Sequence, residues 1–245
     1  LLDKGAEVEA RDTDGWTPLM FAAENSSTPG TVQQLLETGA EVNARGTNDL
    51  TPLMIAAGNS STPEIVALLI EKGAELEARD NNGWTPLMQA AKLSSTPEIV
   101  ALLIEKGAEV NARDTDGWTP LMAAVALSST PEIVELLIEK GAELEAKSTA
   151  GGTPLLFAAS NSNPEIVQLL IEKGAEVNAR HTNSMTPLMF AARGSSTPEI
   201  VALLIEKGAE LEAKSTAGGT PLLFAASNSN PERVQRLLEK GAEVN

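Results

Sequence analysis

Apolar positions along the chain gather in clusters that alternate between two lengths. The shorter cluster first occurs at residues 19–23, which include two alanines and directly follow Thr17 and Pro18. Threonine is a favoured helix cap, and proline is favoured at the first helical position. The pattern therefore predicts a brief first helix that starts at each Thr-Pro.

The longer cluster is the apolar stripe at residues 65–70, which predicts a second helix with a broad buried face. Thr62 stands at the position that caps this helix, and Glu64 lies near its positive end. Lys72 lies near the negative end, and Gly73 is typical of the residue that stops a helix. Each pair of clusters therefore predicts two helices joined by a loop.

The pair of clusters repeats through the whole chain at one period. The threonine of Thr-Pro-Leu stands at 17, 51, 85, 119, 153, 186 and 220, in steps of 34 residues with one step of 33. The fifth and seventh copies lack one residue between the helices, where Asn163 and Asn230 take the capping position. Turn-rich stretches such as residues 74–84 predict a hairpin-like finger between consecutive pairs.

The predicted fold is an all-α repeat solenoid of stacked helix-loop-helix units with hairpin-like fingers. We expect a single repeat domain over residues 1–245 with seven helix pairs, in which residues 1–10 are the remnant of a preceding repeat. The 25-residue block at 141–165 is identical to the block at 208–232. Recent copying of a repeat and deliberate design both account for this identity.

The repeats carry a family resemblance. The run D-x-x-G-W-T-P-L-M-x-A-A followed by P-E-I-V-x-L-L-I-E-K-G-A-E-V-N-A resembles the ankyrin repeat, and the resemblance covers the chain in seven copies. It implies L-shaped units stacked into a curved solenoid whose concave side carries the fingers and first helices. The chain departs from the family's T-P-L-H, because its histidine is replaced by Met20, Met54, Met88, Met122, Leu156, Met189 and Leu223.

One finger position alternates between glutamate and asparagine, starting with Glu9, Asn43, Glu77 and Asn111. Alternation would separate like charges by roughly 20 Å, beyond the Debye length of about 8 Å. A two-repeat duplication would produce the same pattern without any electrostatic advantage. Both interpretations remain open at this point.

The two terminal repeats are more polar than the middle ones. The position of Ile65 holds Thr31 in the first repeat and Arg233 in the last, and the position of Leu68 holds Gln34 and Arg236. Terminal repeats of a solenoid need a polar outer face. We therefore expect these side chains to be exposed, most clearly in the last repeat.

Composition excludes several classes of function. The formal net charge is −16, which opposes binding to nucleic acid and to anionic membranes. The chain has no cysteine, its one histidine is His181, and no apolar run is long enough to span a membrane. DTDG at residues 12–15 lacks the remaining ligands of a calcium loop, so it predicts an Asx turn. We expect a soluble protein with no enzymatic activity and no cofactor.

The aromatic residues occupy two positions of the repeat: the one before Thr-Pro and the fourth position of the first helix. A hydrophobic staple between these two positions accounts for Trp16 with Phe21, Leu50 with Ile55, and Met185 with Phe190. Trp84 and Trp118 have no such partner, since they face Gln89 and Ala123. The position before Thr-Pro accepts Trp, Leu, Gly and Met, which is typical of a variable surface on a constant scaffold.

Exposed aromatic residues beside mixed charges are typical of protein-binding surfaces. The sequence therefore predicts a monomeric scaffold that binds a protein partner on its concave face. The alternative is a structural spacer or capping module, or a designed scaffold without a natural partner. The candidate binding residues are Trp16, Phe21, Glu24, Leu50, Ile55, Trp84, Gln89, Lys92, Trp118, Phe157, His181, Met185, Phe190 and Arg193.

Overall fold

The computed structural model describes residues 7–60, 62–94, 96–127, 130–160, 163–194, 197–228 and 230–243. The chain divides into two compact units, residues 1–115 (unit 1) and 116–245 (unit 2). In the described residues, fourteen α-helices and one 3-10 helix are present and no strand. The expected remnant at residues 1–10 lies mostly outside the described residues, and the single domain over 1–245 stays a prediction.

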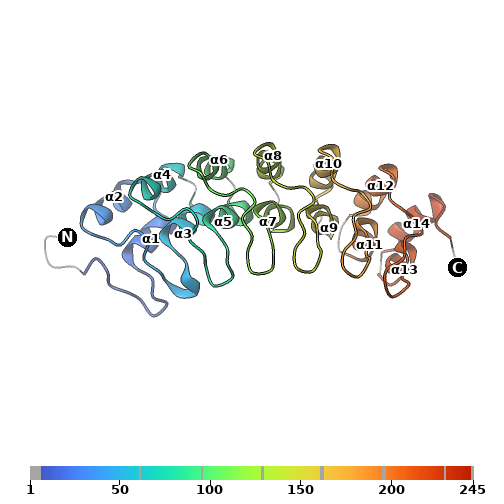
Figure 1. Cartoon of the computed structure of the whole chain (residues 1–245), viewed down its shortest axis with the longest axis horizontal. Helices are drawn as coiled ribbons and strands as arrows, with labels where there is room; N and C mark the ends of the chain where they lie inside the picture. The colour runs from blue at the N-terminus through green and yellow to red at the C-terminus, as the bar shows by residue number, and fades with distance from the viewer. Residues whose placement is uncertain are drawn as a thin grey trace. The chain divides into compact units, whose positions relative to one another are not determined.

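Unit 1 contains three helix pairs. They are α1 (Pro18–Asn25) with α2 (Gly30–Glu37), α3 (Pro52–Asn59) with α4 (Pro63–Glu71), and α5 (Pro86–Leu93) with α6 (Pro97–Glu105), and the 3-10 helix η2 (Thr47–Asp49) lies in a finger. Helix α3 packs against both α1 and α5, and α4 packs against α6. Within this unit the first helices form one row and the second helices another, with the fingers beside the first helices (Figure 1).

Unit 2 contains four helix pairs of the same kind. They are α7 (Pro120–Leu127) with α8 (Pro131–Glu139), α9 (Pro154–Ser160) with α10 (Pro164–Glu172), α11 (Pro187–Arg193) with α12 (Pro198–Glu206), and α13 (Pro221–Ala226) with α14 (Pro231–Glu239). First helices pack on first helices from α7 to α13, and second helices on second helices from α8 to α14. The expected all-α repeat solenoid of stacked helix pairs is therefore confirmed in each unit.

The caps follow the sequence prediction for the first helices but only in part for the second. The Thr17 hydroxyl accepts a hydrogen bond from the Met20 N–H at 3.4 Å, and Asn163 caps α10 by accepting from the Glu165 N–H at 3.0 Å. The predicted cap by the Thr62 side chain is wrong, because its hydroxyl donates to the Ser27 carbonyl at 3.5 Å instead. Asparagine therefore caps the second helix where threonine does not.

The core consists of the same few positions in the first six repeats, whereas in the last repeat Leu222 is half-buried and Leu223 is exposed. In unit 1, Leu19, Leu53 and Leu87 are fully buried, and in unit 2 so are Leu121 and Leu155. The methionines that replace the family's histidine are buried as well, with Met20 and Met88 at 0% exposure. Apolar packing between repeats thus occupies the position that the resemblance assigns to a histidine.

Of the two terminal repeats, the first follows the sequence prediction of exposed polar side chains and the last does not. Thr31 is exposed on α2, as expected, but Arg233 on α14 is only 4% exposed, so its predicted exposure is wrong. Its guanidinium donates hydrogen bonds to the carbonyl oxygens of Ala192 and Gly194 in the preceding repeat. Burial lowers the pKa of Arg233. The position of Arg233 therefore faces the preceding repeat, which buries its side chain.

Candidate functional site

Backbone hydrogen bonds fix the position before each Thr-Pro. In the first finger the Asp12 N–H donates to the Trp16 carbonyl at 3.1 Å, and the Asp12 carboxylate accepts from the N–H groups of Asp14 and Trp16 at 2.9 and 2.8 Å. This is the Asx turn that DTDG predicts. The backbone of the finger is thus held independently of the side chain that Trp16 carries.

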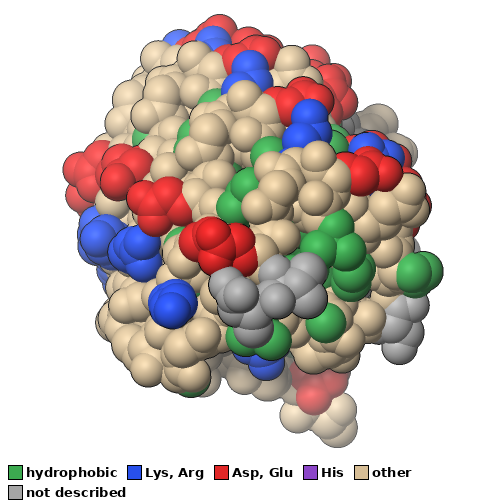
Figure 2. Space-filling view, turned by 90° about the vertical axis from the view of Figure 1, so that its right-hand side faces the viewer, with side chains coloured by type: hydrophobic (Ala, Val, Ile, Leu, Met, Phe, Trp, Pro, Cys, Tyr) green, Lys and Arg blue, Asp and Glu red, His purple; other side chains and the backbone are tan. Residues whose placement is uncertain are grey.

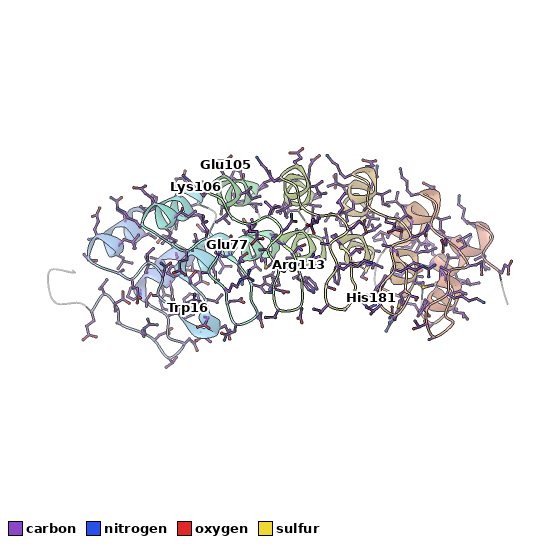
Figure 3. The ribbon with its side chains drawn as sticks, viewed as in Figure 1. Trp16, Glu77, Glu105, Lys106, Arg113 and His181 are labelled. Atoms are coloured by element: carbon purple, nitrogen blue, oxygen red, sulfur yellow. The ribbon has the colours of Figure 1, made fainter. Side chains whose placement is uncertain are left out.

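Further hydrogen bonds join neighbouring fingers within each unit. In unit 1 the Glu75 N–H donates to Asn43 Oδ1 and the Glu109 N–H to Glu77 Oε1, each at 2.9 Å. The alternating position, whose Glu77 is labelled in Figure 3, therefore supplies a hydrogen-bond acceptor whichever residue it holds. The two interpretations of the alternation, charge separation and duplication of a repeat pair, did not include this hydrogen-bonding role.

In unit 2 the equivalent contact places a glutamate carboxylate where burial disfavours its charged form. Glu145 Oε1 accepts from the Glu176 N–H at 2.8 Å. Burial raises the pKa of Glu145, and the hydrogen bond from Glu176 opposes that rise only in part. Asn178 makes the equivalent contact to Glu210 without a charge and also donates to the Gly208 carbonyl.

Arginine side chains form a second connection between fingers in unit 1. Arg45 Nη1 donates to the Arg79 carbonyl at 2.8 Å, and Arg79 Nη1 donates to the Arg113 carbonyl at 2.6 Å. Each also reaches a carbonyl in its own finger, at Asp49 and Gly83. These contacts hold the fingers in register, so the side chains at the finger tips and first helices can differ between repeats.

The predicted staple between Trp16 and Phe21 is present. Their ring centroids lie 5.2 Å apart at an interplanar angle of 53°, and Phe21 is still 44% exposed. Figure 3 shows Trp16 on the side of unit 1 that carries the first helices and fingers, whereas Glu105 and Lys106 lie at the end of α6 on the other side. The aromatic pair is therefore displayed on the first-helix side.

Trp84 contacts a cation instead of a second ring. Lys92 Nζ lies 5.2 Å from the centroid of its half-buried ring, a distance at which a cation is attracted to an aromatic face. Gln89, at the staple position, donates to Asp80 Oδ2 at 3.1 Å, and Asp80 Oδ1 accepts from the Trp84 N–H. The finger and α5 thus form one polar cluster around the indole.

Trp118 has an aromatic partner that the staple rule does not predict. Phe157, from the following repeat, lies 4.5 Å from it between ring centroids, at an interplanar angle of 37°. The ring of Phe157 also covers Gly152, where a Cβ would lie 2.6 Å from Phe157 Cζ. Trp118 thus has no staple partner within its own repeat but packs against the following one, and glycine at 152 makes room for a ring instead of marking a permissive position.

Two candidate binding residues are buried. Ile55 and Met185 are each 3% exposed, and Met185 packs with Met189 against the ring of Phe190. A side chain without accessible surface cannot contact a partner, so both assignments are wrong. The hydrophobic staple, which the sequence predicts for both, is the reason that they are buried.

The remaining candidates in the sixth repeat form a small cluster on the surface. His181 lies edge-on to Phe190 at 5.7 Å between ring centroids, and its Nδ1 pairs with Asn183 Oδ1 at 2.9 Å. Arg193, at the end of α11, is exposed. An aromatic ring, an imidazole and a guanidinium thus lie on the same helix and finger.

Exposed leucines at the ends of two first helices were missed by sequence reasoning. Leu93 on α5 is 49% exposed and Leu127 on α7 is 50% exposed. Gln89, Lys92 and Leu93 are three and four residues apart, so they share one side of α5. The sequence signal that could have identified them is the variation of this repeat position, because it holds leucine at Leu93 and Leu127 but asparagine at Asn25.

We call the surface that these side chains make in each unit the first-helix face of that unit. Leu50 and Glu24 are half-buried members of it, and the Glu24 carboxylate accepts from Asn25 Nδ2 at 3.0 Å. Its members are Trp16, Phe21, Glu24, Leu50, Trp84, Gln89, Lys92 and Leu93 in unit 1, and Trp118, Leu127, Phe157, His181, Phe190 and Arg193 in unit 2.

Comparison with known proteins identifies the repeat. The chain matches the family described as ankyrin repeats (3 copies) over residues 27–114, 97–181 and 155–245. No curated protein matches it. In the part of the chain that the structure describes, no group of three or more acidic or histidine side chains could hold a metal ion, and no helix has the length and apolar character needed to cross a bilayer.

Proposed function

Because the chain belongs to the ankyrin repeat family, whose members are generally protein–protein interaction modules, we propose that it binds a protein partner on the first-helix face. The fingers hold this face through backbone contacts, which leaves its side chains available for recognition. The net charge of −16 disfavours nucleic acid and anionic membranes as alternatives.

The distribution of exposed apolar side chains carries the proposal. Among the described residues, the large apolar side chains that are exposed are Phe21, Leu93, Leu127, Leu223 and Leu238. The first three belong to the first-helix face and the other two to the end of unit 2. Apolar side chains that lie in water beside aromatic rings and charged groups are typical of protein-binding surfaces.

The chemistry around these side chains fits an interface with another protein. Trp84 lies beneath Lys92, and Leu93 extends the same side of α5. Aromatic and aliphatic anchors supply most of the binding energy in protein interfaces, and neighbouring charges orient the partner. The face of unit 1 offers both within one helix and its finger.

Affinity capture with matched variants tests the proposal. The full chain is immobilised beside Trp84→Ala/Leu93→Ser, which alters the first-helix face, and Glu98→Gln/Ala101→Ser, which alters the second helix α6. We expect a protein retained from lysate by the wild type and the α6 variant to be lost from the first-helix variant, while all three chains melt alike. Equal retention by all three would contradict the assignment to this face.

The alternative function is a structural spacer or a scaffold without a partner. Under this alternative, the immobilised chain should retain no protein from lysate, and the first-helix variant should behave as the wild type in every assay. Absence of any specifically retained protein would therefore favour the spacer.

A further inference from the structure

The fingers and first helices of the fifth to seventh repeats carry positive charge in an acidic unit. Unit 2 as a whole contains more Asp and Glu than Lys and Arg, but its residues 146–160, 179–194 and 213–228 contain no Asp or Glu. The corresponding stretches of unit 1 contain both signs, as in Arg79 beside Asp80. We call the four basic residues of these stretches in unit 2 the basic set: Lys147, Arg180, Arg193 and Lys214.

The glutamates of these repeats lie mainly on the second helices. Glu165 and Glu172 are on α10, and Glu199 and Glu206 are on α12. Figure 2, which looks onto the end of unit 2, shows Asp and Glu side chains mostly in its upper half, the side of the second helices. Packed helices lie about 8–10 Å apart, which is comparable with the Debye length of about 8 Å. These glutamates therefore weaken the positive potential of the basic set only in part.

The basic side chains are accessible to a partner. All four residues of the basic set are exposed. Arg180 Nη2 pairs with Glu210 Oε2 at 2.9 Å, and its Nη1 donates to the Ser184 carbonyl at 3.5 Å. Within the part of unit 2 that the structure describes, no carboxylate forms an ion pair with Arg193 or Lys214. These two cations can thus pair with a carboxylate of a partner without breaking an ion pair of their own.

Aromatic rings lie on the same helices and fingers as these cations. Phe157, Phe190 and Phe224 hold the fourth position of α9, α11 and α13, and each is half-buried. Phe190 and Phe224 both pack against the buried cluster that contains Met189. Phe190 and Arg193 are three residues apart on α11, so they share one side of that helix. Unit 2 therefore combines partly exposed rings with cations and no acidic side chain in these stretches.

We propose that the first-helix face of unit 2 binds an acidic segment of a partner protein, rich in Asp and Glu and carrying apolar side chains between them. Carboxylates of the segment pair with the guanidinium of Arg193 and the ammonium groups of Lys147 and Lys214, and its apolar side chains cover the rings. Because this names the partner of the first-helix face, it rests on the proposed function.

A nucleic acid is the competing polyanion. Its phosphates would also meet the basic set, but it would carry many charges past the fingers into the field of the surrounding glutamates. The net charge of −16 opposes such a polymer. A short acidic segment needs to cover only the fingers and first helices, and its apolar side chains use the rings as well.

A phage-displayed library of short random peptides is the probe that tests the partner's chemistry. It is applied to the immobilised full chain and to Lys147→Gln/Arg193→Gln/Lys214→Gln. We expect the peptides retained by the wild type to be enriched in Asp and Glu by about threefold over the starting library. A retained peptide, synthesised and labelled for fluorescence anisotropy, should bind the triple variant on the order of tenfold more weakly.

The matched control removes three positive charges from the second helices of the same unit. Lys140, Lys173 and Lys207 end α8, α10 and α12, and all three are exposed. The variant Lys140→Gln/Lys173→Gln/Lys207→Gln has the same net charge as the first triple variant, and it should bind the acidic peptide as the wild type does. Both variants should melt with the wild type, since they change only exposed side chains.

Three results would overturn the proposal. The first is a library that yields no retained peptide or peptides without enrichment in Asp and Glu. The second is an equal loss of affinity in the two triple variants, which would reflect net charge alone. The third is a labelled oligothymidine that binds the wild type as tightly as the peptide at about 0.15 M salt and is lost from the first variant, which would assign the face to nucleic acid. Affinity capture from lysate is a separate assay, so a protein lost only from the first-helix variant there would still support the proposed function.

Discussion

The hexapeptide GWTPLM occurs at residues 15–20 and 83–88 in unit 1 and at 117–122 in unit 2, and a comparison of the last two copies shows that its two halves behave differently. Leu87 and Leu121 are fully buried in both places. Trp84 lies beneath a lysine, whereas Trp118 stacks on Phe157. The same six residues therefore build the same scaffold, but the use of their tryptophan depends on residues outside the hexapeptide.

Substitutions in the buried half of the hexapeptide should lower the free energy of unfolding the most. Leu121→Ala leaves a cavity in a closely packed stack, and we expect it to cost about 2–5 kcal/mol of unfolding free energy. Leu222→Ala, at the same position in the half-covered last repeat, should cost less. Urea denaturation of both variants measures the difference, and equal losses would contradict a stack stabilised by neighbouring repeats.

A side chain added at Gly152 should cause the next largest loss of stability. Gly152→Ala places a Cβ 2.6 Å from Phe157 Cζ, which is too close for two carbon atoms, and we expect a loss of about 1–2 kcal/mol from the displaced ring. Phe157→Ala should relieve the clash, so the double variant should be no less stable than Phe157→Ala alone. Thermal melts of the three variants check this, and a Gly152→Ala variant as stable as the wild type would show that the position accepts side chains freely.

Gly152 and Phe157 show which kind of contact the sequence patterns do not predict. The repeat period, the Thr-Pro caps of the first helices and the buried leucines follow from local patterns, and the structure confirms them. The contact of Trp118 with Phe157 joins two repeats, and the staple rule compares only positions within one repeat. Arg233 was misjudged for the same reason, because the repeat that buries it comes before it in the stack.

The stacked pair should show measurable coupling. In a double-mutant cycle of Trp118→Ala and Phe157→Ala, we expect a coupling energy of about 0.5–1.5 kcal/mol, typical of an aromatic pair. Additive effects of the two substitutions would mean that the rings contribute through burial alone.

Trp84 should contribute least to folding. Trp84→Ala removes a half-buried ring without a ring partner, and we expect the free energy of unfolding to fall by no more than about 1 kcal/mol. Lys92→Met should remove the cation from the indole and shift its fluorescence in a chain whose other tryptophans are replaced by phenylalanine. A loss as large as that of Leu121→Ala would place Trp84 in the core instead of on the binding surface.

The finger contact made by Glu145 bears on how such a chain grows. The block at 141–165 recurs unchanged at 208–232, and its Glu145 and Glu212 meet the next N–H group at 2.8 and 2.9 Å in both places. The acceptor needs only a backbone amide from the neighbour, so its partner's side chains are irrelevant to the joint. At this joint, a repeat that is duplicated or exchanged by recombination of its gene segment therefore needs no compensating substitution.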